Sequence, residues 1–316
     1  MPKMSTEPAR HALNGATMGT RWSALFFTDA RFDVAPLQAA LQDAVDEVDQ
    51  QMSGWKPGSD LMRINRAPVG EWMDAPRRLL DVLRLGLAIG RDSGGAFDVG
   101  MGDAVTAWGF GPGQATGERI RIALSAKRRP GWETLEIGEG RLRKTGAITL
   151  DLNGIAKGYG VDRLAETLQE FGIHAFLAGI DGEMRAAGLR PDGQPWSIAV
   201  EQPDPERRAT HSVLALEDGA VATSGDYRHW VDVGGRRLSH TMDPRRGAPL
   251  TASPASVTVV AGTCAEADGW ATALMVLGAA EGGALAARLG LDALFLSRAA
   301  DGAITATPAG RLFSGA

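Results

Sequence analysis

The sequence has little cysteine and no long run of one kind of residue. Cys264 is the only cysteine among 316 residues, which excludes an internal disulfide and a cysteine-rich zinc or iron–sulfur site. Because the formal net charge is −5 and no long basic run occurs, nucleic acid is not expected as the main partner. No uninterrupted apolar stretch reaches the 18 or so residues of a membrane span, so none is predicted.

The remaining composition is that of an ordinary globular protein. Hydrophobic residues make up 44% of the chain and charged residues 22%. The length suggests two lobes at about 150 residues per domain. The first ten residues contain neither the apolar core of a secretory signal nor a cysteine to lipidate. We therefore expect a cytoplasmic protein as the sequence stands, and a periplasmic one if an export segment has been removed.

Periodicity predicts helices in the first half and mainly strands in the second. Apolar residues such as Leu37, Leu41 and Val45 predict a helix after Phe32, and a second helix is expected from Pro76 to about Asp92. A strand at 147–152, a glycine-rich turn, a helix at 159–171 and helices at 265–277 and 281–289 follow. Further strands are expected at 174–178, 196–201, 212–216, 230–233, 237–240, 256–261, 293–297 and 303–307, with a hairpin turn at 234–235. This pattern predicts an α+β fold with mostly antiparallel sheets.

The turn from Asp151 to Gly160 leads from the expected strand into a helix. Free backbone N–H groups at such a position, with Lys157 close by, can bind a phosphate. The Gly-Lys-Ser/Thr order of a Walker loop is absent. Taken alone, the turn is better explained as a plain strand-to-helix connection.

Asp268 and Thr272 lie four residues apart in an apolar segment, so a helix would place their oxygens on one face. A hard cation such as Mg²⁺ binds oxygen ligands of this kind, and a buried carboxylate needs a partner. The alternative, which the segment alone favours, is that Asp268 caps the helix start and Thr272 bonds to its own helix.

The segment from Ser239 to Gly247 combines His240, Asp243 and two arginines in one loop. A histidine can accept a proton from a hydroxyl nucleophile near neutral pH, and arginine stabilises phosphate charge. A hydrogen-bonded turn at Asp243-Pro244 is an equally good interpretation.

Two further segments, 94–100 and 223–227, are interpreted as loops. Their glycines could let the backbone approach a planar ligand, or both could be plain loops. A hydrolase that uses Ser224 is a rival, but the Gly-x-Ser-x-Gly elbow is missing.

Together these segments resemble the ApbE family, the FAD:protein FMN transferases. The resemblance spans about residues 17–298. Its matching segments are Met18-Gly19-Thr20, Met52-Ser53 with Ser59 and Asn65, Ala96-Phe97-Asp98, Asp151 to Lys157, Thr223 to Tyr227, Ser239-His240 with Asp243-Pro244-Arg245 and Gly247, and Ala267-Asp268 with Thr272.

The resemblance implies an ApbE-like (T-fold-type) α+β architecture over residues 17–316. Residues 1–16 would be an N-terminal extension, and two lobes with a boundary near residue 145 would enclose an FAD cleft. It further implies Mg²⁺ bound by Gly154, Asp268 and Thr272. The flavin nucleotide would contact Met18, Trp55, Ala96, Phe97, Asp98, Asp151, Lys157 and Met242.

The implied reaction transfers FMN from FAD to an exposed threonine of an acceptor flavoprotein and releases AMP. His240 would be the general base, and Asp243 would orient the loop or the imidazole. An FAD pyrophosphatase that uses water, and a non-catalytic flavin-binding protein, are the alternatives.

The chain departs from the family pattern at two places. Asp181-Gly182-Glu183 stands where Gly-Gly-Asp is common, so no role is carried over to that segment. Ala271 stands where some members have a second carboxylate, which would leave fewer protein ligands for the ion.

Overall fold

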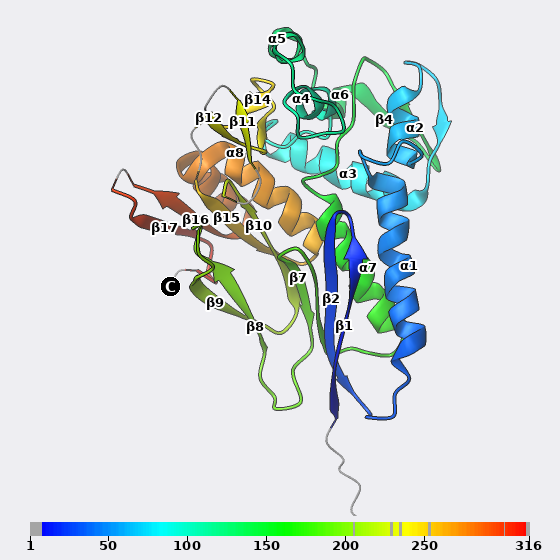
Figure 1. The fold of residues 1–316 in the computed structure, drawn as a ribbon, viewed down its shortest axis with the longest axis vertical. Coiled ribbons are helices and arrows are strands. Elements are labelled where there is room, and N and C mark those ends of the chain that lie inside the picture. The colour runs from blue at the N-terminus through cyan, green and yellow to red at the C-terminus, as the bar shows by residue number, and fades with distance from the viewer. Residues whose placement is uncertain are drawn as a thin grey trace, which may run out of the picture.

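One eight-stranded antiparallel sheet organises the chain (Figure 1). The computed structural model describes residues 8–204, 206–227, 230–233, 236–251, 254–299 and 301–313. Every neighbouring pair in this sheet is antiparallel, which confirms the predicted α+β class. In spatial order the strands are β1 (Ala9–Thr17), β2 (Thr20–Thr28), β6 (Phe176–Ile180), β7 (Glu183–Ala187), β10 (Gly219–Gly225), β15 (Ser256–Ala261), β16 (Asp292–Arg298) and β17 (Ile304–Ala309).

The chain begins with two strands, β1 and β2, that the sequence analysis did not predict. We expected residues 1–16 to form an extension, but β1 begins at Ala9 and pairs with β2 from Ala9↔Thr28 to Thr17↔Thr20. Side chains of β1 alternate between more and less exposed positions, as in a strand with one face covered. Residues 9–16 therefore belong to the sheet.

Three long helices cover one face of the sheet: α1 (Val34–Met52), α7 (Ala156–Glu170) and α8 (Cys264–Leu289). Asp33 begins α1 as predicted near Phe32, because its carboxylate accepts a hydrogen bond from Ala35 N. The buried contacts between helices and sheet include Trp22, Phe26, Leu41 and Leu164. Each such side chain contributes about 1.5–3 kcal/mol by leaving water.

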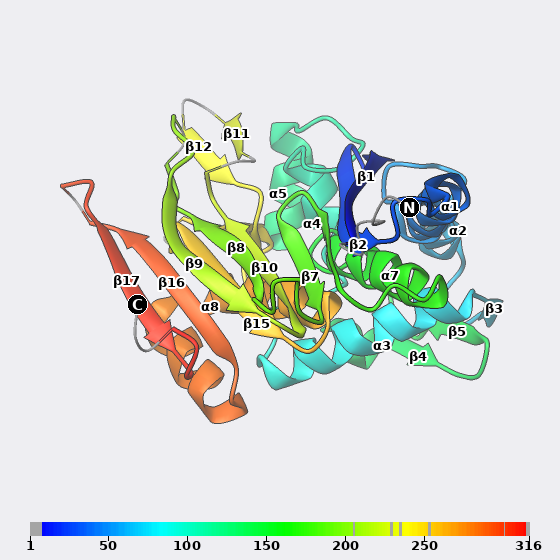
Figure 2. The same ribbon diagram turned by 90° about the horizontal axis from the view of Figure 1, so that it is seen from below.

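The opposite face is covered by a two-stranded sheet of β8 (Trp196–Glu201) and β9 (Thr210–Leu216). Phe295 in β16 packs with the helices, whereas its neighbours Leu294 and Leu296 pack with Trp196 and Leu214 on the other side. This alternation follows from the two-residue period of a strand. Figure 2 shows β8 and β9 beside β10 in a view from below.

A smaller lobe gathers at one end of the main sheet (Figure 1). It contains α2 (Asp60–Arg66), β3 (Met73–Asp74), α3 (Arg77–Asp92), α4 (Gly102–Ala107), α5 (Gly117–Ser125), α6 (Gly131–Thr134), β4 (Leu135–Ile137) and β5 (Arg141–Lys144). Short strands near this end are β11 (Trp230–Val233), β12 (Arg236–Ser239), β13 (Met242–Asp243) and β14 (Ala248–Pro249).

Several predicted elements differ in detail. The expected strand at 147–152 is extended chain with one bridge, Met101↔Thr149. Helix α7 begins at Ala156 rather than Tyr159. The segment 223–225, interpreted as a loop, is the end of β10. The two helices expected at 265–277 and 281–289 are parts of α8, joined at Gly278, which has a non-helical φ of 76°. The predicted hairpin turn at 234–235 lies outside the described residues.

Helix α8 is long and apolar enough, by length and composition alone, to cross a membrane. The sequence had suggested no such segment, because Glu and Asp residues interrupt its apolar run. In the folded chain α8 packs against β10, β15 and α7, as the core helix of a globular domain does.

Helices α7 and α8 cross at very short range. A β-carbon on residue 158 would overlap the backbone carbonyl oxygen of Cys264 and lie 2.8 Å from Cβ of Asp268, so only glycine fits there. The Asp162 carboxylate of α7 accepts hydrogen bonds from Cys264 N at 2.8 Å and Ala265 N at 2.9 Å. In return, Asp268 of α8 accepts one from Gly158 N at 3.0 Å. Each helix therefore binds backbone N–H groups at the start of the other.

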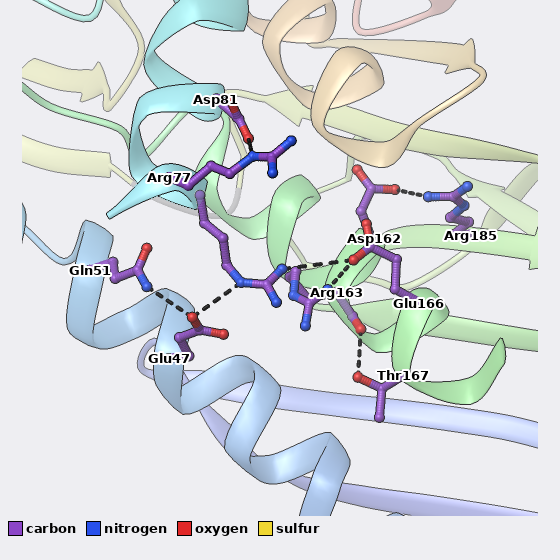
Figure 3. Close-up of polar contacts among 10 residues, drawn as sticks. Glu47, Gln51, Arg77, Asp81, Asp162, Arg163, Glu166, Thr167 and Arg185 are labelled. Atoms are coloured by element: carbon purple, nitrogen blue, oxygen red, sulfur yellow. Dashed lines mark hydrogen bonds and ion pairs between the residues drawn. The ribbon is translucent and has the colours of Figure 1, made fainter. Parts of the chain in front are cut away.

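Ion pairs hold the other side of α7 (Figure 3). Arg78 of α3 contacts Glu47 of α1 at 3.1 Å and Glu166 of α7 at 3.8 Å. Arg163 also pairs with Glu166, and Gln51 donates a hydrogen bond to Glu47. The network links α1, α3 and α7, so α7 is fixed from two directions.

Gly158→Ala tests the close crossing. The added methyl group meets backbone rather than a flexible side chain, so we expect a loss of about 1–3 kcal/mol in the free energy of unfolding. Gly283→Ala in α8 is the matched control, because a β-carbon there meets nothing within 4 Å. That control should stabilise the protein by about 0.5–1 kcal/mol. Urea unfolding measures both, and equal stabilities would contradict the close packing.

Candidate active site

A single cavity of about 1500 Å³ lies between the α7–α8 crossing, one end of the sheet and the smaller lobe. It brings together segments that are far apart in the sequence. All but one of the predicted site residues line it: Met18, Trp55, Ala96, Phe97, Asp98, Asp151, Gly154, Lys157, His240, Met242, Asp268 and Thr272. Asp243 does not.

The three predicted metal ligands converge at the base of this cavity. A β-carbon on Gly154 would lie 3.0 Å from Thr272 Oγ1, so the loop before α7 touches α8 at Thr272. Thr272 Oγ1 also lies 3.2 Å from Ser224 Oγ at the end of β10. Asp268 sits one helical turn before Thr272 and is 4% exposed. The Asp268 carboxylate and the Thr272 hydroxyl are thus on one helix face, and the Gly154 backbone lies beside Thr272.

The charges at the base of the cavity do not balance. Lys157 is the cation paired with Glu183 at 2.7 Å and Asp181 at 3.5 Å, and Asp268 adds a third carboxylate nearby. Burial, and then repulsion by Glu183, raise the pKa of Asp268. Burial alone would lower the pKa of Lys157, but these carboxylates raise it above its usual range. The excess of negative charge is what a divalent cation would neutralise.

The oxygen donors fit a hard cation such as Mg²⁺. Oδ2 of Asp268 is used by Gly158 N, while Oδ1 has no hydrogen-bond partner among the described residues. No group of three or more His, Cys, Asp or Glu side chains suited to a metal occurs in the described part of the chain. The residues therefore fit an ion held by mixed oxygen ligands, with water completing its shell.

The loop before α7 is held by polar side chains. Asp151 accepts hydrogen bonds from Asn153 N at 3.0 Å and from Asn153 Nδ2 at 2.8 Å. Asn65 of α2 binds both backbone groups of Leu150, at 2.7 and 2.9 Å. Burial raises the pKa of Asp151 to about 6. Asn65 was part of the family resemblance without a predicted role. In the structure it fixes this loop against the smaller lobe.

Asp98 and Trp55 contribute two different surfaces to the cavity wall, one polar and one aromatic. The Asp98 carboxylate accepts hydrogen bonds from Gly100 N at 2.7 Å and Gly131 N at 3.1 Å, and burial raises its pKa. Trp55 is 57% exposed at the rim, where its ring offers a stacking surface for a planar group. Ser53 Oγ accepts a hydrogen bond from Trp55 N and shapes this loop.

His240 is half-buried in the cavity wall, and its ring contacts the edge of Phe110 at 6.4 Å between centroids. The Asp243 carboxylate accepts a hydrogen bond from Arg245 N at 3.0 Å within the turn, and Asp243 does not line the cavity. Of the two roles predicted for Asp243, the geometry fits the shaping of the loop. Arg246 points to Thr251, so it does not supply charge to the cavity.

The cavity wall includes residues to which the sequence assigned no role. Asp181 and Glu183 come from the β6–β7 connection, which was noted only as a departure from the family pattern. Glu201 meets Tyr227, a residue of the matching segment 223–227, at 3.3 Å on the side of β8. No sequence signal marks Glu201, because only the folding of β8 over the sheet brings it to the cavity.

The raised pKa of Asp151 predicts a pH effect on stability. Its folded-state pKa of about 6 exceeds the ordinary value of 3.8, so the folded form binds more protons between these pH values. Stability should therefore fall by up to about 3 kcal/mol as pH rises from 4 to 6. Asp151→Asn should make this decline shallower in urea unfolding, because Asp98 and Asp268, whose pKa values are also raised, still contribute to it. Asp92→Asn at the exposed end of α3 should leave the decline as it is. An unchanged decline in Asp151→Asn would contradict the assignment.

Known proteins are similar to this chain in sequence. The model of the ApbE family matches residues 18–295. The FAD:protein FMN transferase of Vibrio cholerae serotype O1 is 37% identical over 295 residues, covering 92% of this chain and 88% of the relative. That of Klebsiella pneumoniae is 34% identical over 286 residues, covering 87% and 82%.

Solved structures of flavin transferases are similar to this chain in fold. The flavin transferase ApbE from Vibrio cholerae superimposes with a TM-score of 0.85 at 35% identity, over 96% of this chain and 97% of that one. The Pseudomonas stutzeri flavinyl transferase ApbE, in its apo form, gives 0.85 at 35% identity over 97% and 96%. On the strength of both sequence and fold, this chain belongs to the ApbE family.

Proposed function

We propose that this protein transfers FMN from FAD to a threonine hydroxyl of an acceptor protein and releases AMP. Membership of the ApbE family supports flavin transfer. The observation that carries the detailed proposal is the single cavity, where a potential base, a lysine and a set of oxygen ligands face surfaces suited to a flavin.

The pyrophosphate of FAD would bind at the start of α7. Lys157 adds a positive charge there, and the dipole of the helix favours an anion, while the N–H groups of Ala156 and Gly158 are already bonded to Leu152 O and Asp268 Oδ2. Asp268, Thr272 and the carbonyl of Gly154 would hold Mg²⁺, which neutralises pyrophosphate charge. The buried methyl group of Ala271 adds no ligand, so water would complete the coordination.

His240 would accept the threonine proton as the hydroxyl oxygen bonds to the phosphorus of the FMN moiety. The bond from that phosphorus to the bridging oxygen breaks, and AMP leaves with the bonding electrons. A histidine suits this step because its pKa lies near neutral pH. Lys157 stabilises the negative charge of the phosphates by electrostatics alone.

Two alternatives use the same residues. An FAD pyrophosphatase would use water in place of threonine, and a flavin-binding protein would perform no reaction. Membership of the ApbE family, whose relatives are FAD:protein FMN transferases, favours transfer over the pyrophosphatase. A passive binder needs neither the clustered oxygen ligands nor a base.

The direct test incubates the protein with FAD, Mg²⁺ and a panel of threonine-containing acceptor proteins. Transfer adds the mass of an FMN group to an acceptor and releases one AMP for each adduct. Free FMN without any adduct would support the pyrophosphatase, and no AMP at all would support the passive binder.

Asp268→Asn should abolish Mg²⁺-dependent AMP release. The amide oxygen can still accept the hydrogen bond from Gly158 N, so the fold is retained while the charged ligand is lost. We expect at least a hundredfold fall in turnover, since metal neutralisation of phosphate charge is worth several kcal/mol. Glu266→Gln on the same helix lies outside the cavity and should turn over normally. Normal turnover in Asp268→Asn would remove this carboxylate from the metal site.

His240→Ala should separate binding from reaction. FAD affinity should stay within about threefold, while transfer falls by about 10²–10⁴, the usual contribution of a general base. Flavin fluorescence measures the first quantity and acceptor mass the second. His174→Ala, on the exposed surface, is the control. If His240→Ala transfers FMN at the normal rate, another group is the base.

A further inference from the structure

The β6–β7 turn forms part of the cavity wall. Asp181 has φ of 53° and Gly182 has φ of 115°, so both lie in the region of backbone space that favours glycine. Aspartate is among the few other residues that tolerate it. An aspartate at the first position is therefore compatible with the shape of this turn. Asp181 adds a carboxylate at the cavity surface.

This turn holds Lys157. The lysine Nζ lies 2.7 Å from Glu183 Oε1 and 3.5 Å from Asp181 Oδ2. The Glu183 side chain is 5% exposed, the Asp181 side chain 35% and that of Lys157 28%. The ammonium group is therefore anchored at the cavity surface by a buried carboxylate and contacted more weakly by an accessible one.

Glu183 is costly to keep in this place. Its second oxygen, Oε2, is buried and has no hydrogen-bond partner in the described structure. Leaving a buried polar atom unpaired is destabilising, and more so for a charged group. An apolar side chain would avoid this cost but would leave Lys157 with the accessible Asp181 alone. A carboxylate retained at such a site, in contact with the lysine of the cavity, points to a functional reason.

We propose that Glu183 is a positioning residue, which fixes the Nζ of Lys157 toward the FAD pyrophosphate. This inference rests on the proposed function, because that function places the FAD pyrophosphate beside Lys157. Asp181 acts differently: as an accessible carboxylate near the same ammonium group, it weakens the attraction of an anionic ligand without fixing the lysine.

The two roles predict different kinetic effects. Glu183→Gln removes a negative charge near the phosphates, which favours FAD binding, but releases the lysine from its anchor. The lysine then no longer stands where charge develops on the departing AMP, so the turnover rate falls. A residue that only supported the fold would instead weaken FAD binding and lower the melting temperature together.

The experiment measures FAD dissociation constants and rates of AMP release with FAD, Mg²⁺ and a threonine-containing acceptor protein from the panel that the wild-type chain modifies. Glu183→Gln should lower kcat at least tenfold with FAD affinity equal or higher, and Glu183→Asp should recover part of the rate. Asp181→Asn should tighten FAD binding with a much smaller loss in kcat. Glu136→Gln removes an exposed, ion-paired carboxylate of β4 and is the control.

A double-mutant cycle with Lys157→Met shows whether Glu183 acts through the lysine. Adding Glu183→Gln to Lys157→Met should cause no further loss in kcat. A further tenfold loss would overturn the proposal, and so would parallel losses of FAD affinity and melting temperature in Glu183→Gln. Equal kcat losses in Asp181→Asn and Glu183→Gln would also overturn it, because charge alone would then explain both. A wild-type protein that releases no AMP with any acceptor of the panel contradicts the proposed function instead.

Discussion

The candidate site depends on the close crossing of α7 and α8. Gly158 lets the two helices touch backbone to side chain, and Asp162 and Asp268 each accept hydrogen bonds from the start of the other helix. This contact places the loop before α7 against Thr272. The oxygen ligands, the start of α7 and Lys157 therefore occupy one corner of the cavity because two helices cannot separate there without losing buried hydrogen bonds.

The same crossing explains the electrostatics of the cavity. Helix starts carry partial positive charge, which stabilises the two buried aspartates, yet the carboxylates still outnumber the lysine. A bound cation would neutralise this excess of negative charge and so favour the binding of an anionic phosphate. Metal and nucleotide binding would then be linked, each favouring the other.

Much of this could be predicted from sequence. The 3.6-residue period identified α1 and α3, and alternation with turn residues identified β8, β9 and β15, because these signals are local. All but one of the predicted site residues line the cavity, and Gly154 and Thr272, which were grouped as ligands of one ion, are neighbours in the structure. The start of β1 at Ala9 was missed because an edge strand with exposed polar residues has a weak pattern.

The remaining features depend on distant contacts. Asp243 was expected near the substrate, but whether its carboxylate faces the cavity or its own turn is decided by backbone geometry that the sequence does not encode locally. Glu183 was set aside because its segment differed from the family pattern. Its bond to Lys157 joins residues 26 positions apart and exists only once β7 pairs with β6 beside α7.

The most direct test is anomalous X-ray diffraction from crystals soaked with FAD and Mn²⁺, which replaces Mg²⁺ at oxygen sites. The account predicts one strong Mn²⁺ peak at the α7–α8 crossing, within bonding distance of Asp268, Thr272 and the Gly154 carbonyl. FAD phosphates should adjoin it on the side of Lys157. A metal peak elsewhere in the cavity, or FAD phosphates bound away from this crossing, would contradict the account.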